Sequence, residues 1–183
     1  MAIAVPPIPT PRFELVSMSL AFMERLLAGD VEGAGQEIGA SVPHDLRENL
    51  DDFLRFRIAD LSVDPSAQPW LGRAIVHTDP DGARWVIGTC GFHAQPGPDG
   101  RVEVGYSIQP QWRRQGVATE AVHALFDWAR AQGVERFRAS ASPDNVGSLA
   151  IITALGFHQA GVQIDDIDGK ELVFELDGWP PGG

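Results

Sequence analysis

The stretch VGYSIQPQWRRQGVATEAVHALFDWARAQ, residues 104–132, decides the fold. Residues 102–108 alternate apolar side chains with small or polar ones, which is the two-residue period of a β-strand. After Gly116 the apolar residues recur every three or four positions, the spacing of one buried helical face, at Val117, Ala118, Ala121, Val122, Leu125, Phe126 and Ala129. Gly133 suits the left-handed position just past a helix end. The order is therefore a strand, a short basic loop and a helix.

The basic loop before this helix predicts an anion-binding site. A helix N-terminus leaves its first amide hydrogens without partners and adds partial positive charge, so phosphate oxygens bind well there. Gly116 and Ala118 are small enough to let a diphosphate approach the backbone, and Arg113 and Arg114 add charge beside it. The alternative is an ordinary surface loop with two solvated arginines.

The loop sequence RRQGVA, residues 113–118, resembles the acetyl-CoA signature of the GCN5-related N-acetyltransferases, the GNAT superfamily. Its surroundings are similar to that family as well, with matches at Glu103, Pro110, Trp112, Asn145 and the Leu-Gly-Phe of residues 155–157. The opening, residues 12–16, resembles the branch that includes ribosomal-protein alanine acetyltransferases. The resemblance implies an acetyl-CoA-dependent N-acetyltransferase.

Length and composition indicate one globular domain, residues 1–183, with flexible tails at 1–11 and 178–183. The chain is 44% hydrophobic and 21% charged, with no apolar run of 18 residues, so we expect neither a membrane span nor a membrane partner. The N-terminus lacks the basic start and long apolar core of a secretory signal, which predicts a cytoplasmic protein. The net charge of −11 argues against nucleic-acid binding.

Cysteine and histidine usage predicts no metal site. The single Cys90 excludes an intrachain disulfide and a multi-cysteine metal centre. The five histidines show no paired metal spacing, although His93 ends a strand near the expected acceptor cleft. A covalent mechanism through Cys90 is disfavoured, because no histidine lies at a diagnostic spacing and a lone strand cysteine is usually a small hydrophobe.

The rest of the chain supplies further strands and helices around this unit. We predict helices over residues 19–28, 30–39, 43–60 and 145–155, and strands over residues 13–16, 70–77, 84–92, 136–141, 157–162 and 170–176. The strand at 136–141 follows a crossover helix and should run parallel to the strand at 102–108. The fold class is thus α/β (α+β), a mixed, mostly antiparallel central sheet flanked by helices. The resemblance implies that the strands carrying Glu103 and Arg136 splay apart and admit the pantetheine arm.

The resemblance also assigns residues to acetyl-CoA. The backbone of residues 114–118 would hold the diphosphate, and the strand edge at residues 106–108 would hydrogen-bond the pantetheine amides. Asn145 is either the cap of its helix or, by resemblance, a hydrogen-bond partner of pantetheine. The full predicted set for the cosubstrate is Tyr106, Ser107, Ile108, Arg113, Arg114, Gln115, Gly116, Val117, Ala118, Asn145 and Ser148.

Two residues are predicted to be catalytic, Glu103 and Ser148. By resemblance Glu103 is the general base that takes a proton from the amine; its alternative roles are to orient the amine or to pair with an arginine. Ile152 stands where many family members carry the tyrosine that protonates the thiolate, which leaves Ser148, one turn earlier on the same helix side, or solvent. Tyr106, the only tyrosine, faces away from Glu103 by strand alternation, and core packing is its expected role.

The sequence leaves the acceptor amine open. A peptide N-terminus, a free amino acid, a polyamine or an aminoglycoside would each suit an acidic cleft, and the opening at residues 12–16 favours a protein N-terminus. Two rival functions stand beside direct acetyl transfer in a ternary complex: a CoA-binding sensor without turnover, and an acyltransferase that uses another acyl-CoA. The oligomeric state is also open, a homodimer included.

Overall fold

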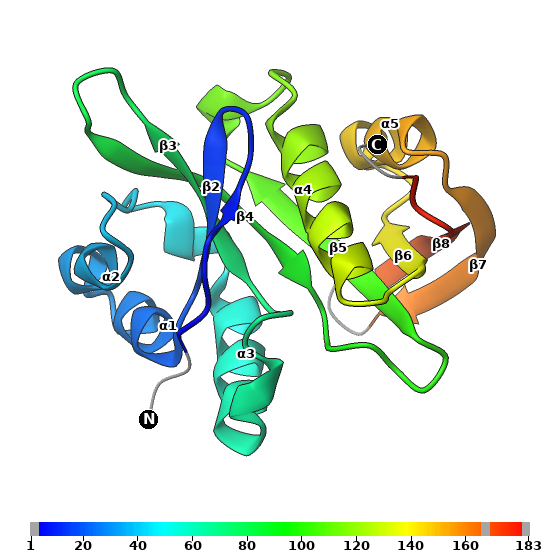
Figure 1. Cartoon of the computed structure of the whole chain (residues 1–183), viewed down its shortest axis with the longest axis horizontal. Helices are drawn as coiled ribbons and strands as arrows, with labels where there is room; N and C mark the ends of the chain where they lie inside the picture. Colours follow the sequence, from blue (N-terminus) through cyan, green and yellow to red (C-terminus); the bar gives the residue numbers. More distant parts are fainter. Residues whose placement is uncertain (1–3, 166–168, 181–183) are drawn as a thin grey trace.

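The computed structural model describes residues 4–165 and 169–180, and a central sheet runs through it in the order β1-β2-β3-β4-β5-β6-β8-β7 (Figure 1). Among the described strands, β5 and β6 pair in parallel and the other neighbours pair antiparallel. This confirms the predicted mixed, mostly antiparallel sheet and its parallel crossover. The strands are β1 (Ile8–Pro9), β2 (Phe13–Ser17), β3 (Arg73–Thr78), β4 (Arg84–Phe92), β5 (Arg101–Ile108), β6 (Arg136–Ala141), β7 (His158–Asp165) and β8 (Gly169–Asp177).

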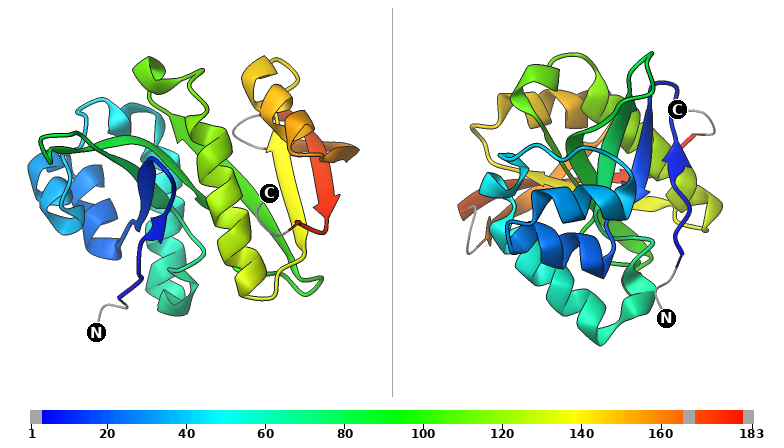
Figure 2. Two further views of the ribbon diagram at one scale, coloured as in Figure 1. Left: turned by 45° about the horizontal axis from the view of Figure 1, so that its top comes forward. Right: turned by 90° about the vertical axis from the view of Figure 1, so that its left-hand side faces the viewer.

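Helices cover both faces of this sheet. Figure 2 shows α4 crossing the sheet, with α1, α2 and α3 grouped beside the N-terminal strands. Within the described residues, no helix is long and apolar enough to span a bilayer. The helices are α1 (Leu20–Leu27), α2 (Val31–Ile38), α3 (Asp51–Val63), α4 (Val117–Ala131) and α5 (Val146–Ala154), with short 3₁₀ turns at η1 (Leu46–Asn49), η2 (Pro65–Ala67) and η3 (Pro110–Trp112).

Strand alternation divides the apolar residues into two cores, one on each face of the sheet. Ile75 and Ile87 belong to the core under α4 and α5, whereas their chain neighbours Val76 and Val86 belong to the core under α1, α2 and α3. Successive side chains of a strand point to opposite faces, so β3 and β4 each contribute to both cores. The second core contains no described residue of β5, β6, β7 or β8. On the face of the sheet that α1–α3 cover, the half formed by β5, β6, β7 and β8 is therefore left to polar side chains.

The structure corrects several predicted boundaries. The helix predicted over residues 43–60 is two pieces, η1 and α3, because Leu50 adopts φ −120° and ψ 0° between them. Both Leu46 and Leu50 are buried, so the break lets the two side chains enter the same core. The strand predicted from residue 70 begins at Arg73, since Leu71 N–H still donates to the turn carbonyl of Gln68. Strand β7 runs to Asp165, and the turn beyond it falls on residues 166–168, outside the described residues.

Part of each predicted tail is packed against the domain. Ile8 is buried, and β1 pairs with β2 through Ile8 and Leu15. At the other end Trp179 is buried and donates its Nε1–H to Asp127 Oδ1 at 2.8 Å. The indole edge also meets the Phe126 ring at 5.1 Å between centroids. The sequence does not predict these contacts, because the Pro- and Gly-rich composition of both segments is typical of flexible tails and does not mark single buried residues.

Arg73 is a fully buried cation that ties the N-terminal segment to the sheet. Its guanidinium donates to the carbonyls of Pro6 and Leu15 at 3.3 Å and of Pro69 at 2.9 Å, and lies 5.3 Å from the Trp128 ring. Burial lowers the pKa of Arg73, because water no longer solvates the charge.

We expect Arg73→Met to lower the free energy of unfolding by about 2–4 kcal/mol, because buried carbonyls lose their donors. Urea unfolding of both proteins measures the difference. Arg25→Met, which removes an exposed arginine with two surface ion pairs, is the control and should leave Tm nearly unchanged. Equal stability of the Arg73→Met and wild-type proteins would contradict this account.

Candidate active site

The N-terminus of α4 has the geometry of an anion site. Gly116 is its N-cap residue at φ 76°, in the left-handed region, and no described side chain caps the helix. The preceding Arg114 is also left-handed, at φ 61°. These two left-handed residues, on either side of Gln115, turn the chain sharply into the helix, so the first amide hydrogens of α4 stay free for a ligand.

Side chains hold this loop in place from three directions. Arg113 Nε–H donates to the carbonyl of Ile108 at 2.9 Å, and Gln115 Nε2–H donates to that of Gln111 at 2.9 Å. Arg12 reaches the loop from before β2 and donates to the carbonyl of Gln115 at 3.1 Å. Arg113 is thus partly engaged in shaping the loop, whereas Arg114 is exposed and has no polar partner among the described residues.

Glu120 and Arg12 form a contact that sequence reasoning missed. Glu120 lies in the first turn of α4, where its charge would oppose a bound anion, but it accepts hydrogen bonds from Arg12 Nε at 2.6 Å and Thr10 Oγ1 at 2.6 Å. Burial raises the pKa of Glu120, but these hydrogen bonds outweigh it and the pKa lies below its ordinary value. Arg12 thus neutralises the Glu120 carboxylate. The two residues are 108 positions apart, so no local sequence pattern predicts their contact.

The parallel ladder between β5 and β6 ends early and leaves a gap. Its last pair is Val104 with Ala139, although β5 continues to Ile108 and β6 to Ala141. Gln109 N–H donates to Ile87 of β4, so by alternation the backbone of Ser107 also faces β4. The backbone groups of Tyr106 and Ile108 face the gap instead.

This gap matches the predicted splayed strands. Two of the three predicted edge residues direct their backbone groups into it, and Ser107 is the exception because its backbone pairs with β4. The carbonyl of Ile108 is occupied by Arg113, which leaves the Ile108 N–H and both backbone groups of Tyr106 for a ligand.

A cavity of about 300 Å³ lies at the gap. Asn145, Ser148 and Ile152 line it from the α5 side. Asn145 Oδ1 accepts from Ser148 N–H at 3.1 Å, so Asn145 is the N-cap of α5. The amide nitrogen of Asn145 has no partner among the described residues, which means that capping and ligand binding are compatible.

Tyr106 lines the same cavity from β5. Its ring packs against the α4 core, as predicted, while its phenol oxygen is buried without a hydrogen bond of normal geometry to any described residue. Burial raises the pKa of Tyr106, and the neighbouring Ser148 hydroxyl opposes part of that rise.

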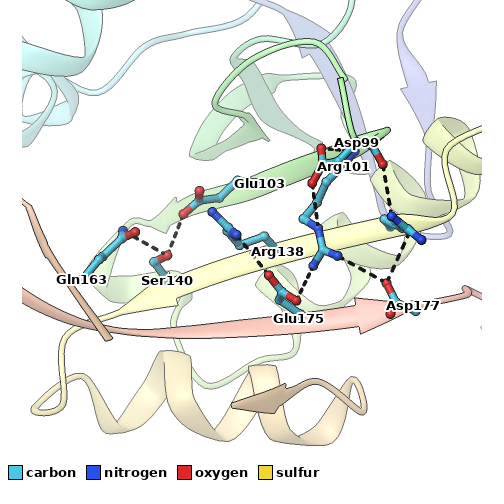
Figure 3. A network of polar contacts seen from close by, with 9 residues as sticks. Asp99, Arg101, Glu103, Arg138, Ser140, Gln163, Glu175 and Asp177 are labelled. Carbon is cyan, nitrogen blue, oxygen red and sulfur yellow. Dashed lines mark hydrogen bonds and ion pairs between the residues drawn. The ribbon is translucent and has the colours of Figure 1, made fainter. Parts of the chain in front are cut away.

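Glu103 lies on the polar face of the sheet that α1–α3 leave uncovered (Figure 3). Ser140 Oγ–H donates to Glu103 Oε1 at 2.7 Å, and Gln163 Nε2–H donates to Ser140 Oγ at 3.3 Å. Gln163 also donates to Glu171 Oε2 at 2.8 Å. Because an amide nitrogen only donates, the chain is directed from Gln163 through Ser140 to Glu103. These contacts hold one carboxylate oxygen and leave Oε2 available.

The arginines beside Glu103 are paired with other carboxylates. Arg101 and Arg138 both contact Glu175, at 2.7 and 3.0 Å, and Arg101 also contacts Asp177 at 3.6 Å (Figure 3). Among the described residues, no arginine forms an ion pair with Glu103, so the predicted alternative of an arginine partner has no support in these contacts.

His93 joins this site to the gap. Its Nδ1 lies 3.9 Å from Glu103 Oε1, and its side chain is about half exposed. His93 lines both the cavity at the gap and a second one of about 220 Å³ that also contains Glu103 and Arg138. Among the described residues, no group of three His, Cys, Asp or Glu side chains could hold a metal ion.

Cys90 is buried on β4, and burial raises the pKa of its thiol to about 12. At pH 8 the thiol therefore stays protonated and out of solvent. We expect no reaction with a chromogenic disulfide at pH 8 in the folded protein and complete reaction in guanidinium, measured by absorbance. Rapid modification of the folded protein would instead reopen the covalent mechanism.

Comparison with known proteins identifies the family of the chain. Residues 27–158 match the family model of the acetyltransferase (GNAT) domain. The chain belongs to this family. A GNAT relative, the N-acetyltransferase p20 of Bacillus licheniformis, named as uncharacterized, is 32% identical over 92 residues, 50% of this chain and 52% of the relative. The chain spans about half the length of the curated relatives that it matches.

Solved structures share the GNAT fold over almost the whole chain. The ribosomal-protein-S5-alanine acetyltransferase of Vibrio fischeri superimposes with a TM-score of 0.60 at 17% identity, covering 96% of this chain and 100% of that one. The microcin C7 self-immunity acetyltransferase MccE, solved with acetyl-CoA and AMP, gives a TM-score of 0.62 at 19% identity over 91% of this chain and 93% of that one. At these identities the likeness concerns the fold alone.

Proposed function

We propose that this protein is an acetyl-CoA-dependent N-acetyltransferase that moves the acetyl group directly to a primary amine in a ternary complex. The observation that carries the proposal is the gap between β5 and β6, with the uncapped N-terminus of α4 beside one side of it and Glu103 on the strand that borders it. Binding a diphosphate would not require a carboxylate there, whereas amine chemistry would.

The residues present fit acetyl-CoA. The free amides of α4, preceded by Gly116 and flanked by Arg114, would bind the diphosphate. The Ile108 N–H and the backbone of Tyr106 would hydrogen-bond the pantetheine amides by extending β5, and the Asn145 amide would add a further donor. A backbone amide of the same edge would stabilise the oxyanion. MccE, of the same fold, was solved with acetyl-CoA.

Glu103 would act as the general base. Its free Oε2 faces the polar side of the sheet, where it would take a proton from the attacking ammonium directly or through water. Ser140 would keep the carboxylate in place while this happens. Ser148, on the α5 side, would hydrogen-bond the sulfur of the thioester.

The acceptor would be an amine that arrives as a cation. Glu103 and Glu171 both lie beside Ser140 and have no arginine partner among the described residues, so they would attract an ammonium group. A peptide N-terminus is our first choice of acceptor, in line with the residues 12–16 and with the fold shared with the ribosomal-protein-S5-alanine acetyltransferase.

The test is thiol release from acetyl-CoA with a panel of short peptides, amino acids, polyamines and aminoglycosides, and with amine-free controls. Since Cys90 is buried, a colorimetric thiol assay reports coenzyme A alone. Amine-dependent release would support the transferase and identify the acceptor class. CoA binding without release on any amine or with any acyl-CoA would favour the sensor, and release only from a longer acyl-CoA would favour the other acyltransferase.

A further inference from the structure

We propose that the Tyr106 hydroxyl is the group that protonates the departing coenzyme A sulfur, a role that rests on the transferase function proposed above. Neither the family match nor the sequence pattern assigns this role, since alternation places Tyr106 away from Glu103 and indicates core packing. In the structure the ring packs against the α4 core, and Tyr106 is at the same time one of the residues that line the cavity at the gap.

The first observation is the cavity itself. Tyr106 enters it from β5, while Ser148 and Ile152 line it from α5. Ile152 is apolar and 2% exposed, so its side chain has no proton to donate to the sulfur. The thioester of a pantetheine arm laid along β5 would reach the strand beside Tyr106. Donor and sulfur would thus meet on the face of the sheet opposite Glu103, which keeps the acid apart from the base.

The second observation is that the phenol oxygen is buried and makes no hydrogen bond of normal geometry to any described residue. A buried polar group without a partner destabilises the protein, and such groups are retained where a ligand or a reaction uses them. A bound sulfur would supply the missing acceptor. Ser148 contributes by position, since its hydroxyl interacts with the phenol and opposes the effect of burial.

The ionisation of Tyr106 suits a donor. Burial raises its pKa, so the phenol is fully protonated at neutral pH. A phenol is a stronger acid than the aliphatic hydroxyl of Ser148, and Ser148 is therefore better placed to stabilise the phenolate than to donate the proton itself. Solvent has restricted access because the tyrosine is partly buried.

The step balances without a further reactant. When the tetrahedral intermediate collapses, the C–S bond breaks and sulfur takes its electron pair. The Tyr106 O–H proton moves to sulfur, which gives the free thiol and a phenolate, and the Ser148 hydroxyl turns from the sulfur to hydrogen-bond this phenolate. The phenolate then regains a proton from solvent, and the proton lost by the amine leaves through Glu103.

The chain offers an unusually clean test because Tyr106 is its only tyrosine. Growth on 3-fluorotyrosine places the label at this single position and lowers the phenol pKa with little change of shape. The basic limb of the pH profile of kcat should move to lower pH by the amount that the phenol pKa falls. An unmoved limb would overturn the proposal.

A second variant separates catalysis from binding. Tyr106→Phe keeps the ring in the core and should lower kcat about 100-fold, within the usual range for a lost general acid, with little change in the Kd of acetyl-CoA. The matched variant Tyr106→Leu removes the ring as well and shows what lost packing alone does to Kd and Tm. Unchanged kcat in Tyr106→Phe would refute the role.

The same label tests the placement without any turnover. The single ¹⁹F resonance should shift when coenzyme A binds and should not shift in the same way with desulfo-coenzyme A, because only the former brings sulfur to the phenol. If wild-type protein turned over no amine, the transferase proposal would fail, and equal shifts with both ligands would separately show that Tyr106 does not contact the sulfur.

Discussion

Glu103→Gln is expected to lower kcat/KM for the amine by about 10²–10⁴-fold, the usual contribution of a positioned general base. The substitution keeps the shape of the side chain and its acceptor oxygen, so Ser140 can still donate to it across the 2.7 Å that separates the two oxygens. What is lost is the ability to take a proton. The Kd of acetyl-CoA should not change, because the contacts that we propose for the cosubstrate lie on the backbone of β5 and at α4.

Kinetics over a range of pH provide the decisive measurement for Glu103. We expect the wild-type pH profile of kcat/KM to have an acid limb that is absent from Glu103→Gln, because the variant has no carboxylate to take the proton. Asp177→Asn is the matched control, since Asp177 is a carboxylate of the same polar face that contacts Arg101 and Arg136 at the far end of the network. Asp177→Asn should keep both the wild-type kcat/KM and the acid limb of the pH profile. A Glu103→Gln protein with wild-type rate and pH profile would remove Glu103 from the mechanism.

The local part of this site is readable from the sequence. The helix α4, the small Gly116 before it, the left-handed Gly133 after it and the strand of Glu103 follow from periodicity and residue type within some 30 residues. The two cores also follow, because alternation in strands such as β3 decides which side chain faces which helix layer. Patterns of this kind depend on neighbours in the chain, so a single sequence contains them.

The partners of the catalytic candidates are not readable in that way. Ser140 meets Glu103 only because β5 and β6 pair with Glu103 opposite Arg138, and Gln163 joins them from β7 across β8. Arg12 likewise meets Glu120 across 108 residues. Register between distant strands fixes these contacts, and one residue of slip would turn every side chain to the other face. The position of Tyr106 at the gap depends on the same register.

The second large effect is expected at the anion site at the N-terminus of α4, where Gly116→Ala should weaken coenzyme A binding. Gly116 lies at φ 76°, and a residue with a Cβ is strained there by roughly 1–2 kcal/mol. Space is not the obstacle, since the nearest atom to the added Cβ would be Arg12 Nη2 at 3.5 Å. We expect the loop to relieve this strain by turning its amides away from the proposed diphosphate position. If this strain is paid on binding, the Kd of coenzyme A should rise about 5- to 30-fold, which is the same free energy expressed as an affinity ratio.

Calorimetry with two ligands distinguishes this effect from general destabilisation. Coenzyme A should lose affinity for Gly116→Ala, while a pantetheine that lacks the diphosphate should bind both proteins equally. Gly133→Ala is the control, because Gly133 has φ 89° and nothing within 4 Å of an added Cβ, at the opposite end of α4. It carries the same backbone strain and should lower Tm similarly, yet leave the Kd unchanged. Equal losses of coenzyme A affinity in both variants would contradict a specific role of Gly116 in binding. Backbone strain at either end of α4 would then be enough to weaken the affinity.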